Sequence, residues 1–271
     1  MAASSGSIRL HALDNLRAAL MWLGIVLHVS VNHTTGPALL PFRDGATTLL
    51  ADMLLMFIHA FRMPAFFVLA GFLAALMVAD RGHVAMFRNR VRRIALPFAV
   101  FWPLLFTAMV LLVLLWAHLM RFGTFGLDVS LAPKPNPGRA TINTMHMWFI
   151  YYLFIFCAMA ALACSVSRRV PQLTRAVNRL TDTLALNWWG VLMLAAPLAM
   201  IGSLYPNGIV VPDGSFLPNV RELVHNGLFF IFGWTVFRHR AVLLARFADR
   251  CWLYALAGTV GYKRSAALPV R

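Results

Sequence analysis

Arg17 and His28 are the two residues whose types and spacing most directly suggest chemistry. They stand eleven positions apart, in a run that begins with the charged stretch from Leu13 to Arg17 and then becomes apolar. On an α-helix, eleven residues make three turns plus about 20°, so both side chains lie on one face, about 16 Å apart along the axis. An imidazole can take the proton of a hydroxyl near neutral pH, and a guanidinium can orient it or stabilise developing negative charge.

Simpler interpretations exist for both residues. Arg17 can pair with Asp14, three residues earlier on the same side of the helix, and His28 can be a histidine that is hydrogen-bonded within a helix bundle. Each ionisable side chain inside an apolar span is nevertheless a candidate site residue, because its insertion into a bilayer costs about 3 kcal/mol.

Three further residues are possible substrate-binding groups. His59 and Arg62 are three residues apart beside Pro64, so we expect them to face a common cavity at an irregular helix. His146 opens a later apolar run beside aromatic residues that an interfacial belt would also place there. For the other ionisable residues near span ends, a structural or interfacial role is the better interpretation: Asp52, His118 and His225.

The densest basic cluster is the run Arg88-Asn89-Arg90-Val91-Arg92-Arg93 in the stretch from Asp80 to Arg93, which we expect to be a turn. It can serve simply as an anchor on the cytoplasmic side of the membrane. It can also bind a polyphosphate, because guanidinium groups make bidentate contacts to phosphate oxygens. Coenzyme A, with a pyrophosphate and a 3′-phosphate, fits Arg90, Arg92 and Arg93 in that role.

The elements that must position these residues are membrane spans. The chain has 271 residues, of which 61% are hydrophobic and 12% charged, with a mean hydropathy of +0.73. Soluble domains are about 45–50% apolar and 25% charged. The sequence therefore predicts an all-α polytopic transmembrane bundle, with a single membrane-embedded domain over residues 1–271 in contact with the lipid bilayer.

Hydropathy predicts about six spans and a C-terminal fragment. We expect Pro64 to kink or end a helix, leaving a kinked or re-entrant piece before it. The apolar piece from Cys251 to Tyr262 is too short to cross. The predicted spans are Leu16 to Val31, Leu49 to Met63 joined to Ala65 to Ala79, Ala95 to Leu119, Met145 to Val166, Trp188 to Tyr205, and Leu223 to Phe237.

The distribution of basic residues predicts the orientation. The connections on the N-terminal side carry fourteen arginines, and those on the other side carry five basic residues, among them Arg43, Arg121, Lys134 and Arg139. Under the positive-inside rule the N-terminus, with Arg9, is cytoplasmic. The net charge of +15 is thus explained without nucleic acid as a partner.

No metal site is expected, since the sequence shows no clustered ligands. A haem-binding bundle using His28, His59, His146 or His225 as axial ligands is one alternative. A transporter with a midplane site at Pro64 is another. The basic run after the second span favours a phosphate-bearing ligand over both.

Four segments in this order resemble the acyltransferase-3 family of integral membrane acyltransferases, over about residues 9–255. They are Leu13-Asp14-Asn15-Leu16-Arg17 with His28, Phe66-Phe67-Val68-Leu69-Ala70-Gly71-Phe72, Arg88 to Pro97, and His146-Met147-Trp148-Phe149. Within the family the nearest branch looks like the glucan biosynthesis protein C group, which is associated with succinylation of periplasmic glucans.

The resemblance implies an enzyme of the bacterial inner membrane that transfers an acyl group, succinyl or acetyl, from cytoplasmic acyl-CoA to a carbohydrate or glucan hydroxyl at the periplasmic face. It implies His28 as the catalytic histidine, Arg17 as its partner and the arginines at 90–93 as the CoA contact. The chain departs from the family in Ala70, where serine is usual, and in its length. Family members have about ten spans, so we expect a chain shortened at its C-terminus.

Overall fold

The structure is a computed structural model that describes residues 11–36, 45–132, 142–187, 189–205, 210, 212–254 and 256. All regular structure in these ranges is helical, which confirms the predicted all-α fold. The chain divides into two compact units, Met1–Leu69 and Ala70–Arg271, and each is described by itself. That both form one domain remains a prediction.

The first unit contains α1 (His11–Val31) and the first part of α2 (Leu49–Arg81). Asp52, in the first turn of α2, accepts hydrogen bonds from the backbone N–H of Thr35 at 3.1 Å and from its hydroxyl at 2.5 Å. His33 adds a ring contact of 2.9 Å to the carbonyl of Ala46. Asp52 therefore has the structural role that its position near a span end indicated.

The expected break at Pro64 is wrong in one respect, because the helix does not end there. Helix α2 is 33 residues long and continues through Pro64. Proline removes a single backbone hydrogen bond, and the apolar residues on both sides keep the remaining backbone groups paired within the helix, as a hydrocarbon environment requires.

The basic run is also helical and is not the turn expected from its polarity. Helix α3 (His83–Arg90) passes directly into a π-helical segment, Val91–Ala95, and then into α4 (Leu96–Phe122). Gly82, at φ 82°, is the point at which the chain turns from α2 into α3. Helix α4 ends at Gly123, whose φ of 70° is a left-handed conformation that favours glycine.

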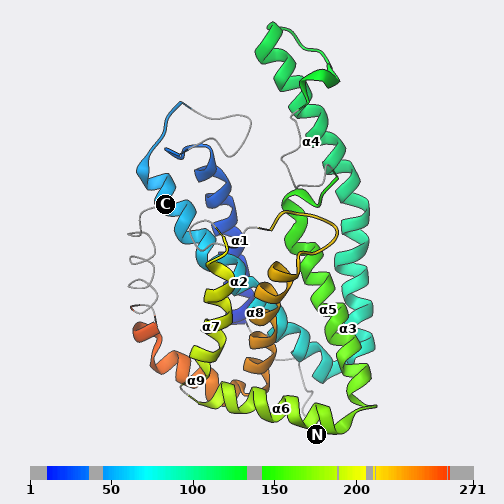
Figure 1. Cartoon of the computed structure of the whole chain (residues 1–271), viewed down its shortest axis with the longest axis vertical. Coiled ribbons are helices and arrows are strands. Elements are labelled where there is room, and N and C mark those ends of the chain that lie inside the picture. The colour runs from blue at the N-terminus through cyan, green and yellow to red at the C-terminus, as the bar shows by residue number, and fades with distance from the viewer. Residues whose placement is uncertain are drawn as a thin grey trace, which may run out of the picture. The chain divides into compact units, whose positions relative to one another are not determined.

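The remaining helices of the second unit surround α5 (Trp148–Ser167) and α8 (Val220–Arg238). Helix α3 packs against α5, with Met86 fully buried and the rings of Phe87 and Phe154 stacked at 5.9 Å. Helix α6 (Pro171–Leu186) runs across the ends of α5 and α8 (Figure 1). The other helices are α7 (Gly190–Gly202) and α9 (Arg240–Asp249).

Four helical stretches are long and apolar enough to cross a membrane, or up to five if the pair α8 and α9, bent by 104°, counts as one span. The described part of the chain thus holds fewer spans than the six predicted. The apolar stretch of α7 covers only Leu192–Gly202, and α8 turns sharply at His239. The polytopic helical class is confirmed, with four to five candidate spans in the described residues.

Several sequence predictions lie outside the described residues. They concern Arg9, Arg43, Lys134 and Arg139 in the orientation count, the end of the apolar piece from Cys251 to Tyr262, and the tail after it.

Helices α2 and α8 approach closely at Gly71. A Cβ atom placed on Gly71 would lie 1.9 Å from the carbonyl oxygen of Phe230. Small residues allow this backbone contact between membrane helices, and Phe72 beside it meets Phe237 edge to face at 5.3 Å. The glycine of the Phe66 to Phe72 segment is thus a packing requirement.

We expect Gly71→Ala to destabilise the protein by about 2 kcal/mol or more, because the added methyl group would push α2 away from a backbone atom that cannot move alone. Thermal unfolding in detergent measures the loss. Gly45→Ala is the matched control, since a Cβ there meets nothing within 4 Å. Equal melting temperatures for the two variants would contradict the assignment.

Candidate functional site

The face of α1 that carries Arg17 and His28 also carries Gly24. Gly24 is seven residues after Arg17 and four before His28, so the three positions lie within about 40° of each other around the helix. Arg17 and Asp14 form an exposed ion pair at 3.7 Å, as the simpler interpretation predicted. An exposed pair of this kind holds its partners weakly. The side chain of His28 is exposed.

Arg62 brings a second guanidinium to this face of α1. Its Nε donates a hydrogen bond to the carbonyl of Leu20 at 3.1 Å. A Cβ atom on Gly24 would lie 2.5 Å from Arg62 Nη2, so the absence of a side chain at Gly24 makes room for the guanidinium. Phe66, one turn further along α2, has its ring 5.7 Å from the same group.

The first unit therefore assembles three of the four candidates that it contains on one helix face: Arg17, Arg62 and His28. The fourth candidate, His59, is half-buried one turn before Arg62 on α2 and interacts electrostatically with it. Arg62 lies over Gly24, one turn before His28, and Arg17 lies about 16 Å from His28 along the axis. Cations spaced along a face that bears an imidazole suit an extended ligand with negative charge, and the nearer one suits a reaction that develops it.

In the second unit the basic cluster lies on one continuous helical segment. Arg92 and Arg93 are exposed, whereas Arg90 is half-buried beside the thiol of Cys157 on α5, a fully buried residue. The Nε of Arg90 is buried and has no hydrogen-bond partner in the described part of the chain. A π-helical turn directly after Arg90 changes the register of the segment, a feature that is frequent at functional sites.

His146 lies in a short 3₁₀ turn, Met145–Met147, directly before α5, and its side chain is exposed. The preceding Thr144 is fully buried, and both its backbone N–H and its hydroxyl donate to the carbonyl of Gly214, at 2.6 and 2.8 Å. Met145 has a φ of 51°, a left-handed conformation that costs energy for a residue with a side chain. The loop around Gly214 thus fixes the backbone that presents His146.

Sequence analysis missed a buried carboxylate in the second unit. Glu222, in the first turn of α8, is 2% exposed. It accepts hydrogen bonds from the hydroxyl of Tyr152 at 2.8 Å and from the backbone N–H of Asp213 at 3.3 Å. Asn226, one turn later on α8, is also buried, and its Nδ2 has no partner in the described ranges. The only signal was an acidic residue at the start of an apolar run, which is also what a helix N-terminus favours.

Aromatic residues enclose the loop that precedes α8. Phe216 lies edge to face with Trp102 at 5.0 Å and with Tyr151 at 5.6 Å, and its carbonyl accepts the Tyr151 hydroxyl at 2.8 Å. The indole N–H of Trp102 donates to the carbonyl of Asn143 at 3.0 Å. These contacts join α4, α5 and the loop into one packed layer next to His146.

Two other histidines have local partners. His118 contacts the carbonyl of Thr124 at 2.8 Å at the end of α4, and the ring of His225 meets Phe229 at 5.3 Å. The structural interpretation of both residues agrees with these contacts.

Comparison with known proteins identifies relatives over almost the whole chain. A family model described as an acyltransferase domain, of the acyltransferase-3 type, matches residues 10–262. The glucans biosynthesis protein C of Salmonella typhi is 26% identical over 261 residues, which cover 94% of this chain. That of Salmonella heidelberg (strain SL476) is 27% identical over 266 residues, with the same coverage.

The chain spans 65% of the length of these curated relatives. No solved structure matches.

We expect Tyr152→Phe to lower the melting temperature measurably, because Glu222 would lose one of its donors in a buried position, at a cost of about 1–3 kcal/mol. Circular dichroism of the purified protein in detergent measures it. Tyr254→Phe is the control, because Tyr254 is exposed and its ring contact with Phe247 survives the change. Identical melting curves for the Tyr152 variant and the parent would show that the bond contributes nothing.

Proposed function

This chain belongs to the acyltransferase-3 family, and from that premise we propose that it is a membrane-bound O-acyltransferase that uses acyl-CoA. The acyl group, succinyl or acetyl, passes to a hydroxyl of a carbohydrate or glucan. The name of the relatives, glucans biosynthesis protein C, supports a glucan acceptor. The proposed location is the bacterial inner membrane, with the N-terminus in the cytoplasm and the acceptor on the periplasmic side.

His28 is the proposed general base. Its imidazole takes the proton of the acceptor hydroxyl as the oxygen attacks the thioester carbonyl carbon. The carbon–sulfur bond then breaks, the acyl group stays on the acceptor oxygen, and the sulfur of CoA takes up a proton. The exposure of His28 supports this role, because a substrate must be able to reach the ring.

The single observation that carries the proposal is the position of Arg62 over Gly24. It places a second cation on the helix face that already bears Arg17 and His28. Negative charge develops on the carbonyl oxygen during acyl transfer, and the guanidinium of Arg62, one turn from the base, is placed to stabilise it. Arg17, whose pair with Asp14 is exposed, is the proposed partner of His28, and Arg62 is the proposed substrate-binding group.

Arg92 and Arg93 are the proposed contacts for the phosphates of acyl-CoA, since both are exposed on a rigid helical segment. Arg90 is proposed to contact CoA through the part of its guanidinium that is not buried. His59 and His146 are proposed to contribute to substrate binding. The exposed His146, on a backbone fixed by Thr144, suits contact with a polar acceptor.

We expect His28→Ala to lower acyl-CoA turnover by about 100-fold or more, because general base catalysis contributes about 10² to 10⁴ to the rate. Release of free CoA from succinyl-CoA or acetyl-CoA, measured in reconstituted vesicles with glucan as acceptor, follows the reaction. His118→Ala is the control, because the contacts of that ring are local to the end of α4, with the carbonyl of Thr124 and the ring of Phe122. A His28 variant as active as the parent would rule out the proposed role.

We expect Arg92→Gln and Arg93→Gln to raise the KM for acyl-CoA about tenfold each while kcat changes little, because a charge-assisted contact to phosphate contributes about 1.5–3 kcal/mol. Acyl-CoA without the 3′-phosphate tests the contact directly: a variant that has lost it no longer distinguishes the two donors. Arg121→Gln, an exposed arginine at the end of α4, should leave both constants unchanged. Unchanged KM values in both cluster variants would remove the phosphate assignment.

A further inference from the structure

Helix α6 carries an exposed apolar stripe on one side. Leu173, Val177 and Leu180 are 63%, 50% and 60% exposed, and their spacing of four and three residues places them within about 60° of each other around the helix. Val170, directly before the helix, extends the stripe and is also exposed. Such a stripe is typical of a helix that buries one side in an apolar environment.

The stripe is not the side by which α6 attaches to the rest of the second unit. Asn178 and Asp182 lie on the opposite side of the helix and contact the end of α8. Arg238 Nη1 donates to Asn178 Oδ1 at 2.6 Å, and Arg238 and His239 contact Asp182 at 3.2 and 2.9 Å. Helix α8 therefore contacts the polar side of α6 at Asn178 and Asp182, and the apolar side remains exposed.

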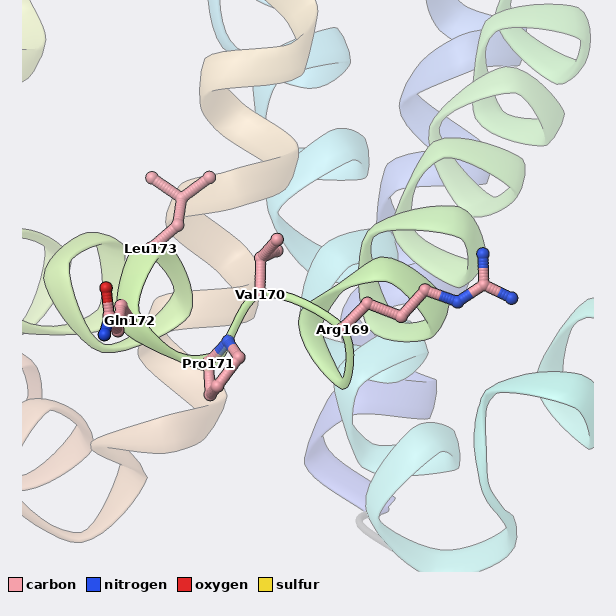
Figure 2. Close-up of a pocket in the computed structure, with 5 residues that line it drawn as sticks. All are labelled: Arg169, Val170, Pro171, Gln172 and Leu173. Carbon is pink, nitrogen blue, oxygen red and sulfur yellow. The ribbon is translucent and has the colours of Figure 1, made fainter.

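The stripe lies next to the end of a neighbouring span, α5. Figure 2 shows Val170 and Leu173 pointing to the side of α6 from which α5 rises, while Pro171 points to the other side. Near its end α5 exposes Leu162 and Val166. An amphipathic helix across the end of a span, with its apolar side turned toward that span's exposed surface, has the geometry of a helix lying in a membrane interface.

Arginines accompany the stripe along the polar side. Arg175 and Arg179, one turn apart, line a surface pocket with Gln172 and Ala176. Arg169 lines a second pocket at the start of the helix (Figure 2). Within the helix the one acidic side chain, Asp182, is already paired with Arg238 and His239. Paired guanidinium groups above an apolar stripe match a phosphate at the level of lipid headgroups.

We propose that α6 lies in the plane of the membrane interface and binds anionic phospholipid, with its apolar stripe among the acyl chains and Arg175 and Arg179 on headgroup phosphates. The charge of the flanking residues favours lipid over a protein partner as the occupant. The apolar stripe matches the acyl chains of an anionic leaflet, and Arg175 and Arg179 match its phosphate headgroups. This inference does not depend on the proposed enzymatic function.

The stripe can be tested with the full chain in vesicles of phosphatidylcholine and phosphatidylglycerol. Native cysteines 157, 164 and 251 are replaced by alanine, and a fluorescent label is placed at Val177→Cys. Nitroxide-labelled lipid should quench this label strongly, and aqueous iodide should quench it weakly.

Gln172→Cys provides the matched position, since five residues on a helix correspond to about 140° of rotation. Its label should show the reverse preference. A Val177 label that is shielded from both quenchers would mean that another protein or a second copy covers the stripe, and one quenched mainly by iodide would mean that it faces water. Either result overturns the proposal.

The role of Arg175 and Arg179 is tested by a separate comparison, in which the nitroxide is carried either by phosphatidylglycerol or by phosphatidylcholine. Quenching at Val177 by the anionic lipid should exceed quenching by the neutral lipid about twofold, and the ratio should fall to about one in the double variant Arg175→Gln, Arg179→Gln. Arg121→Gln should leave it unchanged. A ratio that survives in the double variant would overturn the assignment of these arginines to headgroups.

Discussion

A polar group inside a bilayer must find its partner within the protein, and this constraint underlies most of the contacts in both units. Arg62 donates to the carbonyl of Leu20, and Glu222 is held by Tyr152 and by the backbone of Asp213. Thr144 is tied to Gly214 by two hydrogen bonds. Each contact satisfies a buried or half-buried polar group, and each also fixes the distance between two segments that are remote in sequence.

The same constraint explains why small residues stand at the closest approaches. Gly24 leaves space for the guanidinium of Arg62, and Gly71 lets the backbone of α2 meet that of α8. Within lipid no hydrophobic driving force acts between helices, because the acyl chains are as apolar as the side chains. Close packing and internal hydrogen bonds must therefore hold the helices together. The glycine on one helix therefore provides the space that the polar side chain of the neighbouring helix needs to make its hydrogen bond.

Charge is distributed in a way that separates these internal contacts from those at the surface. Arg62 and Arg90 are partly buried: Arg62 donates a hydrogen bond to the carbonyl of Leu20, and the Nε of Arg90 is buried. Four other arginines are exposed: Arg92, Arg93, Arg175 and Arg179. Arg92 and Arg93 lie in the helical stretch His83–Phe122, and Arg175 and Arg179 lie on α6. The ligands proposed for these exposed arginines, CoA and lipid headgroups, carry phosphate. One residue type thus serves as an internal hydrogen-bond donor in one place and as an electrostatic contact in another.

Helical period and hydropathy are local properties, and they were enough to predict the helical membrane class, most of the apolar helices, and the shared face of Arg17 and His28. Helix α2 does not end at Pro64 and the basic run is helical, since the local preferences of proline and clustered charge are weaker than the need to keep backbone groups paired. The contacts of Arg62 over Gly24, of Tyr152 with Glu222 and of Gly71 with Phe230 are visible only in the three-dimensional structure. The partners in these contacts are far apart along the chain, and no local pattern records which distant residue a side chain will meet.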